Sequence, residues 1–351
     1  MTAPSQAGPE PLSFDRLRRL QASLARRVVQ RDAANILQVG FAPQRNDRPT
    51  IAPQQSLSVT AQFDVQRKLQ RVPSERRVSP VESVRLLDRS SRSYLQFELH
   101  TDVLPTGNIV PTGVRVESGA DYATTSVVVR WTKITPVPTV DTIEQAQDPR
   151  WRWGVLCVAH LFAKQSSTTP TQARVERQTT CGVGPDSVRG EVVARGRVPR
   201  GPDISLIETG LDRLWLSGLL PHPNAPKLQP ANESQLLDWI STGTEGTFLG
   251  DGVTHAWQWQ TFYPELQIES LGRLRHIVRY QSSANPTSSH PFGPGSSGGV
   301  LVAGGIPIGL QIAAINPDFQ TAFAQTFDVS LQWLQNRLRA TALHIVHLVA
   351  E

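Results

Sequence analysis

The sequence predicts a mainly β protein with more than one domain. Glycine and proline, 25 and 27 of the 351 residues, are spread along the whole chain, and short valine-rich runs lie between them. Short strands joined by frequent turns are typical of β architectures. The chain is longer than one ordinary domain, and its apolar content of 39% is sufficient for sizeable cores. We therefore expect two or three domains.

The N-terminal part, residues 1–105, is predicted to form a small α+β domain. A helix is expected from Leu12 to Arg31, because Ser13 is a suitable N-cap and apolar residues recur at steps of three and four. These apolar residues are Phe14, Leu17, Leu20, Leu24 and Val28. The strand-like stretches ANILQVGF, SLSVTAQFDVQRKL and YLQFELHTDVL follow the helix.

A domain boundary is predicted at 105–113, where the sequence PTGNIVPTG contains two Pro-Thr-Gly turns. The larger domain, 114–351, divides into a β-rich half at about 114–208, a polar linker at about 209–233 and a second half at about 234–351. A short helix is expected at Ser234 to Ile240. The second half should close with an amphipathic helix at about Val329 to Val349.

Ser297 lies in the run Gly295-Ser296-Ser297-Gly298-Gly299, which is typical of a nucleophile loop. A serine that attacks an acyl group needs an exposed tight turn with backbone N–H groups beside it, and glycine permits that backbone. By itself the motif also fits an ordinary turn between strands.

His160 and Asp203 strengthen the interpretation of Ser297. Each adjoins an apolar strand, WGVLCVAH before the histidine and ISLIE after the aspartate. The order is His, Asp, Ser, with spacings of 43 and 94 residues. In the chymotrypsin triad the corresponding spacings are about 45 and 93.

With these motifs, the chain resembles the trypsin-like serine peptidases of the chymotrypsin superfamily, of a bacterial type with an N-terminal accessory domain. CVAHLF is similar to the family's AAHC element, DISLIE to DIALL, and GSSGGVLV to GDSGGP. The resemblance implies two six-stranded antiparallel β-barrels, at about 114–208 and 234–351, and a closing helix that FDVSLQWLQNRL would form.

The resemblance also implies the roles of the site residues. Ser297 would be the nucleophile, His160 the general base and Asp203 the residue that orients the imidazole. The N–H groups of Gly295 and Ser297 would form the oxyanion hole. Asp186 and Asp251 are the alternative acids.

The substrate pocket is expected to be apolar. In the family the residue six before the nucleophile lies at the base of the pocket, and here it is Pro291, which carries no charge. The facing strand would contribute Ile312, Ala313 and Ala314. Cleavage after small or medium apolar residues is therefore expected.

One residue departs from the family's digestive enzymes. Ser296 stands where those enzymes carry an aspartate that pairs with a new N-terminal ammonium group. No such ion pair can form with a serine. The nucleophile loop should therefore be held by local hydrogen bonds, including one from the Ser296 hydroxyl.

Three functions remain open at this point. The first is a serine endopeptidase, which hydrolyses peptide bonds of a protein or peptide substrate. The second is a catalytically silent binding module with the same fold, and the intact triad argues against it. The third is an esterase-type hydrolase that uses the same residues on small acyl groups.

Composition argues against several other classes. Residues 1–100 carry 16 Lys and Arg against 9 Asp and Glu, and the other residues carry 19 against 21. The basic part lacks charge runs and interleaved aromatic residues, so we expect no nucleic-acid binding. Docking of a protein partner is one role open to it, and packing required for folding is the other.

No cofactor, metal or membrane span is expected. His344 and His347 lie three apart, but no Cys, Asp or Glu pattern accompanies them. The sequence shows no signal peptide and no apolar stretch of membrane-spanning length. With two cysteines, a disulfide framework is not indicated, and a cytoplasmic location is the expectation.

Overall fold

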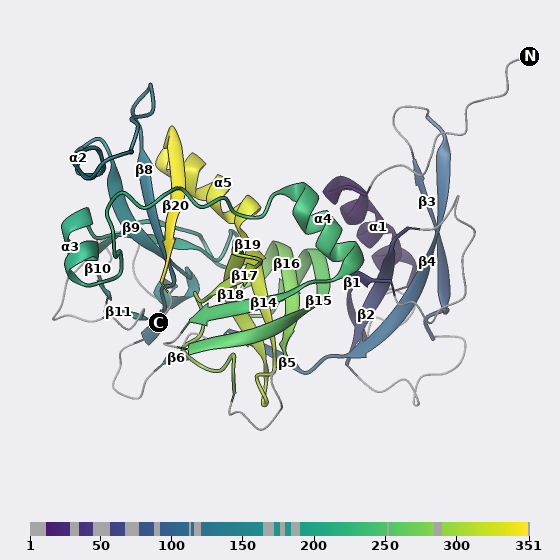
Figure 1. Ribbon diagram of the computed structural model, residues 1–351. Helices are drawn as coiled ribbons and strands as arrows, with labels where there is room; N and C mark the ends of the chain where they lie inside the picture. Colours follow the sequence, from purple (N-terminus) through teal and green to yellow (C-terminus); the bar gives the residue numbers. More distant parts are fainter. Residues whose placement is uncertain are drawn as a thin grey trace, which may run out of the picture. The chain divides into compact units, whose positions relative to one another are not determined.

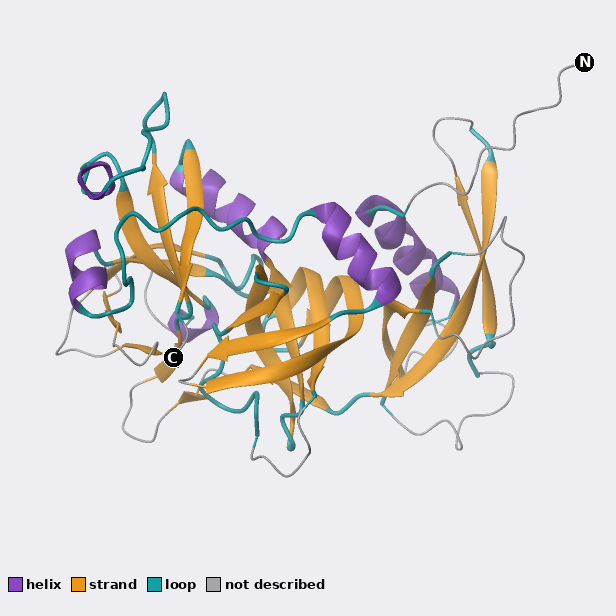
Figure 2. Cartoon of the chain, viewed as in Figure 1, coloured by secondary structure: helices purple, strands orange, loops and turns teal. Residues whose placement is uncertain are grey.

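The computed structural model is mainly β, as Figure 2 shows by its predominance of strands, so the predicted fold class is confirmed. The structure describes residues 12–28, 35–44, 57–66, 77–87, 92–111, 114–115, 121–163, 172–175, 180–183, 190–250, 253–283 and 290–349. The chain divides into two compact units. Unit 1 is Met1–Gly107, Glu233–Gly243 and Gln260–Glu265, and unit 2 is Asn108–Asn232, Thr244–Trp259 and Leu266–Glu351.

Unit 1 combines two helices with a small sheet. Its elements are α1 (Phe14–Arg27), β1 (Ile36–Pro43), β2 (Val59–Val65), β3 (Val81–Leu87), β4 (Tyr94–Pro105), α4 (Glu233–Thr242) and the central residues of β15 (Val253–Ile268). The strands follow the order β15-β1-β2-β4-β3, and the β2–β4 pair is parallel. Two stretches within the range expected for the second barrel, α4 and residues 260–265, thus belong to unit 1.

Helix α1 begins as the sequence predicts. The Ser13 side chain accepts a hydrogen bond from the N–H of Arg16 at 3.2 Å, which satisfies one of the free donors of the first turn. Leu17, Leu20 and Leu24 are fully buried. The helix packs on β1 and β3 through this apolar face.

The first sheet of unit 2 has nine strands in the order β20-β8-β9-β13-β12-β10-β11-β7-β6. Their bounds are β6 (Val114–Arg115), β7 (Asp121–Thr124), β8 (Val127–Thr132), β9 (Arg152–Cys157), β10 (Gln172–Val175), β11 (Thr180–Val183), β12 (Gly190–Arg195), β13 (Ser205–Glu208) and β20 (Ala342–Leu348). The short helices α2 (Ile143–Ala146) and α3 (Leu211–Leu216) adjoin this sheet in the sequence.

The second group of strands forms a ring of pairings. Its members are β14 (Glu245–Gly250), β15, β16 (Gly272–Ser282), β17 (Val300–Ala303), β18 (Ile306–Asn316) and β19 (Thr321–Thr326). The order is β14-β17-β18-β19-β16-β15, and β15 pairs again with β14. Six paired strands were expected of the second barrel. The short strand β5 (Asn108–Pro111) adds to β18.

The predicted closing helix is present but shorter than expected. Helix α5 (Phe327–Leu338) ends at Arg339, whose φ of 53° is left-handed. Residues 342–348, expected to be helical, form strand β20 instead and pair with β8, as the yellow strand beside α5 in Figure 1 shows. Pairing with β8 satisfies backbone groups that a longer helix would leave unpaired on that strand.

The core of unit 2 joins the two groups of strands. Trp131 and Leu156 of the first sheet, Val300 and Leu310 of the second, and Phe327 of α5 belong to one buried cluster. Both sheets are therefore fixed relative to each other within this unit, which gives loops from either sheet a defined position.

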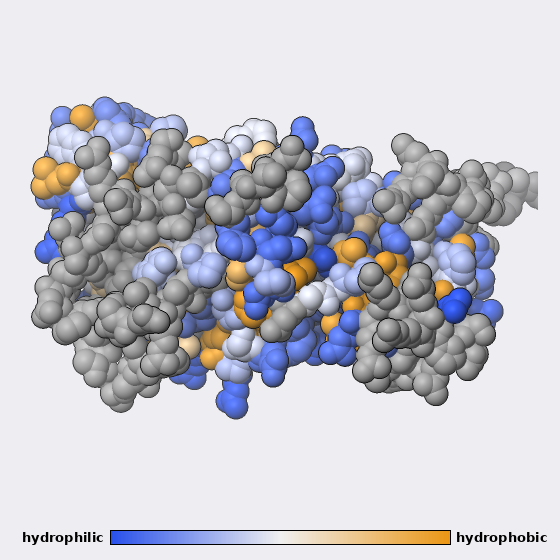
Figure 3. Space-filling model, turned by 90° about the horizontal axis from the view of Figure 1, so that it is seen from below, coloured by the Kyte–Doolittle hydropathy of each residue, from blue (hydrophilic) through white to orange (hydrophobic). Residues whose placement is uncertain are grey.

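No helix in the described ranges is both long and apolar enough to cross a bilayer. On the face drawn in Figure 3, hydrophobic residues form small groups separated by hydrophilic ones.

Candidate active site

His160 and Asp203 are brought together by the pairing of two strands. His160 follows β9 and opens a short 3-10 turn, and Asp203 precedes β13. Because β9 and β13 pair antiparallel, with Ser205 opposite Cys157, the end of one strand lies beside the start of the other. The Nδ1 atom of His160 lies 2.6 Å from Oδ2 of Asp203, and the His160 N–H donates to Oδ1 at 2.8 Å.

Asp203 is held through its carboxylate and through its backbone N–H. Its side chain is fully buried, against 10% exposure for the His160 side chain. The Asp203 N–H donates to Oε1 of Gln325 on β19 at 3.0 Å, and Nε2 of Gln325 donates to the carbonyl of Arg275 at 3.1 Å. The buried carboxylate contacts both the Nδ1 atom and the backbone N–H of His160, and this fixes the orientation of the imidazole.

The remaining imidazole nitrogen is buried and has no hydrogen-bond partner among the described residues. This atom is Nε2 of His160. A buried polar atom without a partner is uncommon in folded proteins and needs an explanation. Here it leaves one ring nitrogen available to a group that is not bound to it in this conformation.

Ser297 lies at the turn before β17, and its hydroxyl donates to the carbonyl of Ile312 at 3.3 Å. The residue is fully buried. The structure thus brings His160 and Asp203 together, whereas the hydroxyl of Ser297 is bonded to β18 and not to Nε2 of His160.

Two glycines give the loop its shape. Gly295 and Gly298 have φ values of 98° and 91°, in the left-handed region that favours glycine. A Cβ atom on Gly298 would lie 2.0 Å from the carbonyl oxygen of Thr124. The run of glycines around Ser297 is therefore required by the backbone.

Thr124, the last residue of β7, holds the loop at two points. Its hydroxyl donates to the carbonyl of Gly295 at 2.9 Å, and its N–H donates to the carbonyl of Ser297 at 2.7 Å. Thr124 is fully buried. The first sheet therefore fixes two peptide groups of a loop that belongs to the second.

The peptide groups of the expected oxyanion hole have defined directions. The carbonyl of Ser296 accepts from the N–H of Gly299 at 3.0 Å. Because C=O and N–H of a trans peptide point in opposite directions, this bond also orients the N–H of Ser297. The N–H of Gly295 has no acceptor among the described residues.

The Ser296 hydroxyl holds the loop from inside, as the sequence predicts. It donates to the carbonyl of Gly293 at 2.6 Å and accepts from Nε2 of Gln311. Oε1 of Gln311 accepts from the Tyr280 hydroxyl at 2.6 Å. Burial raises the pKa of Tyr280, which keeps this hydroxyl protonated as a donor.

The partners Gln311, Tyr280, Thr124 and Gln325 were not identified from the sequence. They lie on β18, β16, β7 and β19, and no motif marks them. They reach the loop and the acid through strand pairing between distant segments, a relation that spacing along the chain does not encode.

The residues expected to line the substrate pocket are all buried. Ile312, Ala313 and Ala314 lie on β18, and the Ile312 carbonyl contacts Ser297 directly. Pro291 lies in the turn before the loop. The next residue, Phe292, is tied to β18, because Nε2 of Gln311 donates to its carbonyl at 3.4 Å.

The other candidate residues have different surroundings. The alternative acids Asp186 and Asp251 lie outside the described residues. His344 and His347, expected on a helix, lie on strand β20. Within the described ranges, no group of three or more His, Cys, Asp or Glu side chains is arranged to hold a metal ion.

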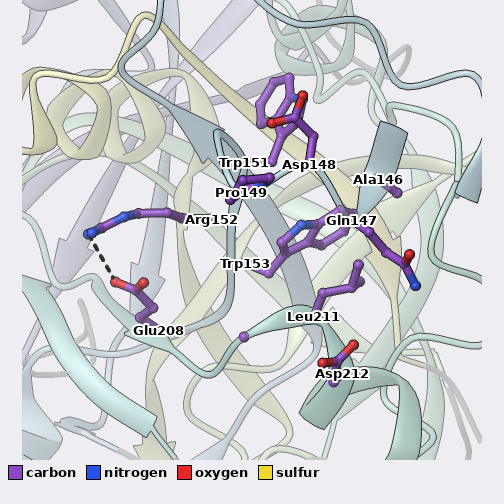
Figure 4. A pocket seen from close by; sticks show the side chains of 11 residues that line it. Ala146, Gln147, Asp148, Pro149, Trp151, Arg152, Trp153, Glu208, Leu211 and Asp212 are labelled. Atoms are coloured by element: carbon purple, nitrogen blue, oxygen red, sulfur yellow. Dashed lines mark hydrogen bonds and ion pairs between the residues drawn. The ribbon is translucent and has the colours of Figure 1, made fainter. Parts of the chain in front are cut away.

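A cavity of about 570 Å³ lies where β9 begins and β13 ends, at the other end of these strands from His160 and Asp203. Figure 4 shows the α2–β9 connection, β9 and the start of α3 around it. Its charged lining includes Asp148, Asp212 and the ion pair of Arg152 with Glu208, whose nearest atoms are 3.4 Å apart. None of the predicted site residues lines it.

Comparisons with known proteins complete the description. No protein-family model and no curated protein matches the sequence. Among solved structures, a chymotrypsin of Cellulomonas bogoriensis matches 55% of this chain and 86% of its own length, with 16% identity and a TM-score of 0.32. The HtrA-type protease AlgW with a decapeptide matches 62% of this chain and 64% of its own, with 15% identity and a TM-score of 0.35.

A Nocardiopsis protease matches 68% of this chain and 97% of its own length, with 10% identity and a TM-score of 0.32. The chain is structurally similar to chymotrypsin-like and HtrA-type serine proteases, at low identity.

Proposed function

We propose that the protein is a serine endopeptidase that uses Ser297, His160 and Asp203. The observation that carries this proposal is the double contact of His160 with the buried Asp203 carboxylate, through Nδ1 and the backbone N–H. It leaves Nε2 without a partner, which is the atom that a general base uses. Ser297, which lies in a turn between glycines, supplies the nucleophile.

The reaction requires the Ser297 hydroxyl to change its hydrogen-bond partner. The Ser297 hydroxyl leaves the Ile312 carbonyl, to which it is bonded at 3.3 Å, and turns to Nε2 of His160. His160 takes the hydroxyl proton while Oγ attacks the substrate carbonyl, and it then returns the proton to the leaving amine. Water, activated by the same nitrogen, releases the acyl group.

The developing oxyanion is stabilised by the N–H groups of Gly295 and Ser297. Removal of one such donor raises the barrier by about 2.7–4 kcal/mol. The Gly299 hydrogen bond fixes the peptide that carries the Ser297 N–H, and the Thr124 hydroxyl holds the Gly295 carbonyl, so that the loop needs little reorganisation during the reaction.

The substrate is a peptide or protein, cleaved after a small or medium apolar residue. The buried, uncharged residues Pro291, Ile312, Ala313 and Ala314 favour such a side chain over Lys or Arg. In the same proposal, residues 1–105 dock a protein partner or substrate through their excess of basic residues.

A catalytically silent binding module is the second candidate. One observation favours it: the Ser297 hydroxyl is bonded to Ile312, and Nε2 of His160 is not engaged. An esterase would use the same residues as a peptidase, so only the hydrolysis of ester and peptide substrates distinguishes these two activities.

A fluorophosphonate probe, which reacts with activated serines, tests the proposal. We expect it to label the full chain and not Ser297→Ala. Ser330→Ala is a matched control, because that buried hydroxyl bonds only within helix α5, to the Thr326 carbonyl. Labelling of Ser297→Ala, or no labelling of the folded chain, would contradict the proposal. Hydrolysis of peptide and ester substrates then separates the two hydrolases.

A further inference from the structure

Strand β5 pairs with the edge of β18 beside the proposed nucleophile, Ser297. β5 (Asn108–Pro111) pairs antiparallel with the last residues of β18. The opposed pairs are Pro111 with Ala313, Val110 with Ala314, Ile109 with Ile315 and Asn108 with Asn316.

Strands β17 and β5 pair with different parts of the same edge of β18, and the nucleophile loop lies between them. β17 pairs with the first half of β18 as far as Val300 opposite Leu310. The pairing of β5 with β18 begins at Ala313. Between these two stretches of β18, the Gln311 N–H donates to the Gly299 carbonyl, and the Gly298 N–H donates to the Gln311 carbonyl, at 2.8 Å each. The nucleophile loop therefore pairs with β18 at Gln311.

The position of Ser297 makes this edge suitable for a peptide substrate. Ile312, whose carbonyl contacts the Ser297 hydroxyl, directly precedes Ala313, the first residue that β5 covers. A peptide that adds to this edge in the direction of β5 would bring its following residue opposite Ile312 and hence to Ser297. Addition of an extended peptide to a sheet edge is a common mode of recognition.

The chain itself fills the position that such a peptide would take. Ile109, Val110 and Pro111 are half-buried, so their side chains as well as their backbone contribute to the contact. The segment is covalently attached and is therefore present at a high effective concentration, on the order of 1 mM for a short flexible connection.

We infer that β5 is an intramolecular competitor of the substrate, bound to the substrate edge of β18. A peptide must displace it, and the segment also indicates the class of peptide that fits: an extended strand with apolar residues and a proline, as in Ile-Val-Pro. The assignment of the edge to substrate rests on the proposed function, whereas the occupation by β5 does not.

Competition has a measurable consequence. If the β5 segment and a free peptide of the same sequence each bind the edge with an intrinsic Kd of about 100 μM, an effective β5 concentration of about 1 mM raises the apparent Kd of the peptide roughly tenfold. Loss of the β5 pairing should restore the intrinsic affinity.

The test compares two substitutions at one position. Val110→Pro removes the N–H that faces Ala314, and Val110→Ala keeps it. Both are made with Ser297→Ala, so that no probe is cleaved. Binding of a fluorescently labelled peptide with the sequence of residues 107–111, Gly-Asn-Ile-Val-Pro, is measured by anisotropy. We expect the Val110→Pro chain to bind it about tenfold more tightly than the Val110→Ala chain.

Hydrogen exchange locates the binding. Added peptide should slow exchange of the amides in residues 312–316 of the Val110→Pro chain, and should have little effect on the Val110→Ala chain. Asn108→Pro is the second variant, used if circular dichroism shows that Val110→Pro is unfolded, because the N–H groups of alternate residues of β5 face β18. Equal affinity of the Ala and Pro chains, or no binding to a folded Pro variant, would overturn the inference.

This measurement requires no hydrolysis. A chain that the fluorophosphonate probe fails to label, but that binds the peptide only after Val110→Pro, would refute the proposed peptidase and leave β5 as the occupant of a peptide-binding edge. A labelled chain whose peptide affinity is insensitive to the substitution would refute the competition and keep the peptidase.

Discussion

The backbone N–H of Asp203 donates to the side-chain Oε1 of Gln325 at 3.0 Å, and both residues are buried. Asp203 precedes a strand of the first sheet of unit 2, and Gln325 lies on β19 of the second group of strands. The proposed acid is therefore positioned from both halves of the unit.

Gln325→Met should destabilise the protein and lower its activity. The substitution keeps the approximate volume and leaves the buried N–H of Asp203 without an acceptor, which costs about 1–3 kcal/mol. Urea unfolding measures the loss of stability, and hydrolysis of an apolar peptide measures the loss of kcat. An exposed glutamine, Gln258→Met, serves as control. Unchanged stability in Gln325→Met would show that the bond contributes nothing.

Asp203→Asn should leave the fold intact and reduce kcat by about 10⁴-fold, because an amide no longer holds the imidazole in the required tautomer. The measurement is peptide hydrolysis by protein whose circular dichroism matches that of the unmodified chain. Activity within tenfold of the unmodified chain would exclude Asp203 as the acid and direct attention to Asp186 and Asp251.

Thr124→Val should lower kcat about fivefold with little change in KM. The substitution removes the hydroxyl that holds the Gly295 carbonyl at 2.9 Å, and a typical hydrogen bond of about 1 kcal/mol has an effect of this order. Thr124→Ser keeps the hydroxyl and should retain most of the activity. If the serine variant is as impaired as the valine variant, packing of the methyl group and not the hydrogen bond is responsible.

His344 should make the protein less stable in mild acid. Burial, followed by the charges of Lys227 and Arg130, lowers its pKa from 6.5 to about 4. Arg130 lies directly opposite it on β8, and the Trp151 ring is 5.5 Å away. Between pH 6.5 and 4 the unfolded chain binds the proton and the folded chain does not, so stability falls as the pH falls through this window.

The measurement is Tm at pH 7 and at pH 4.5 for the unmodified chain and for His344→Gln. The variant should lose less stability between the two pH values than the unmodified chain does. The same loss in both chains would assign the acid sensitivity to other groups.

The sequence predicts the parts of this molecule that depend on neighbouring residues. His160 and Asp203 could be placed because each adjoins a strand that is evident from its apolar residues, and the two do contact each other. The glycines around Ser297 predict a turn because few other residues adopt a φ near 98°. Ser296 could be given its role because it stands where the similar digestive enzymes carry an aspartate, and the partner that the structure gives it, Gly293, lies three residues away.

What the sequence could not predict depends on contacts between distant segments. Gln311 reaches Ser296 only because β18 lies beside the loop, and Thr124 reaches Gly295 across 171 residues. The stretch 342–348 was misassigned to a helix because a short apolar run suits either a helix or a strand. Pairing with β8 favours the strand over the helix.

Strand β20 also constrains when the first sheet can form during synthesis. Its partner β8 ends at Thr132, and β20 begins at Ala342, so the ribosome adds more than two hundred residues between them. At roughly 5–20 residues per second, this takes about 10–40 s. Throughout that delay the nascent chain presents a valine-rich strand with one unpaired side, which a second nascent chain could pair with in place of β20.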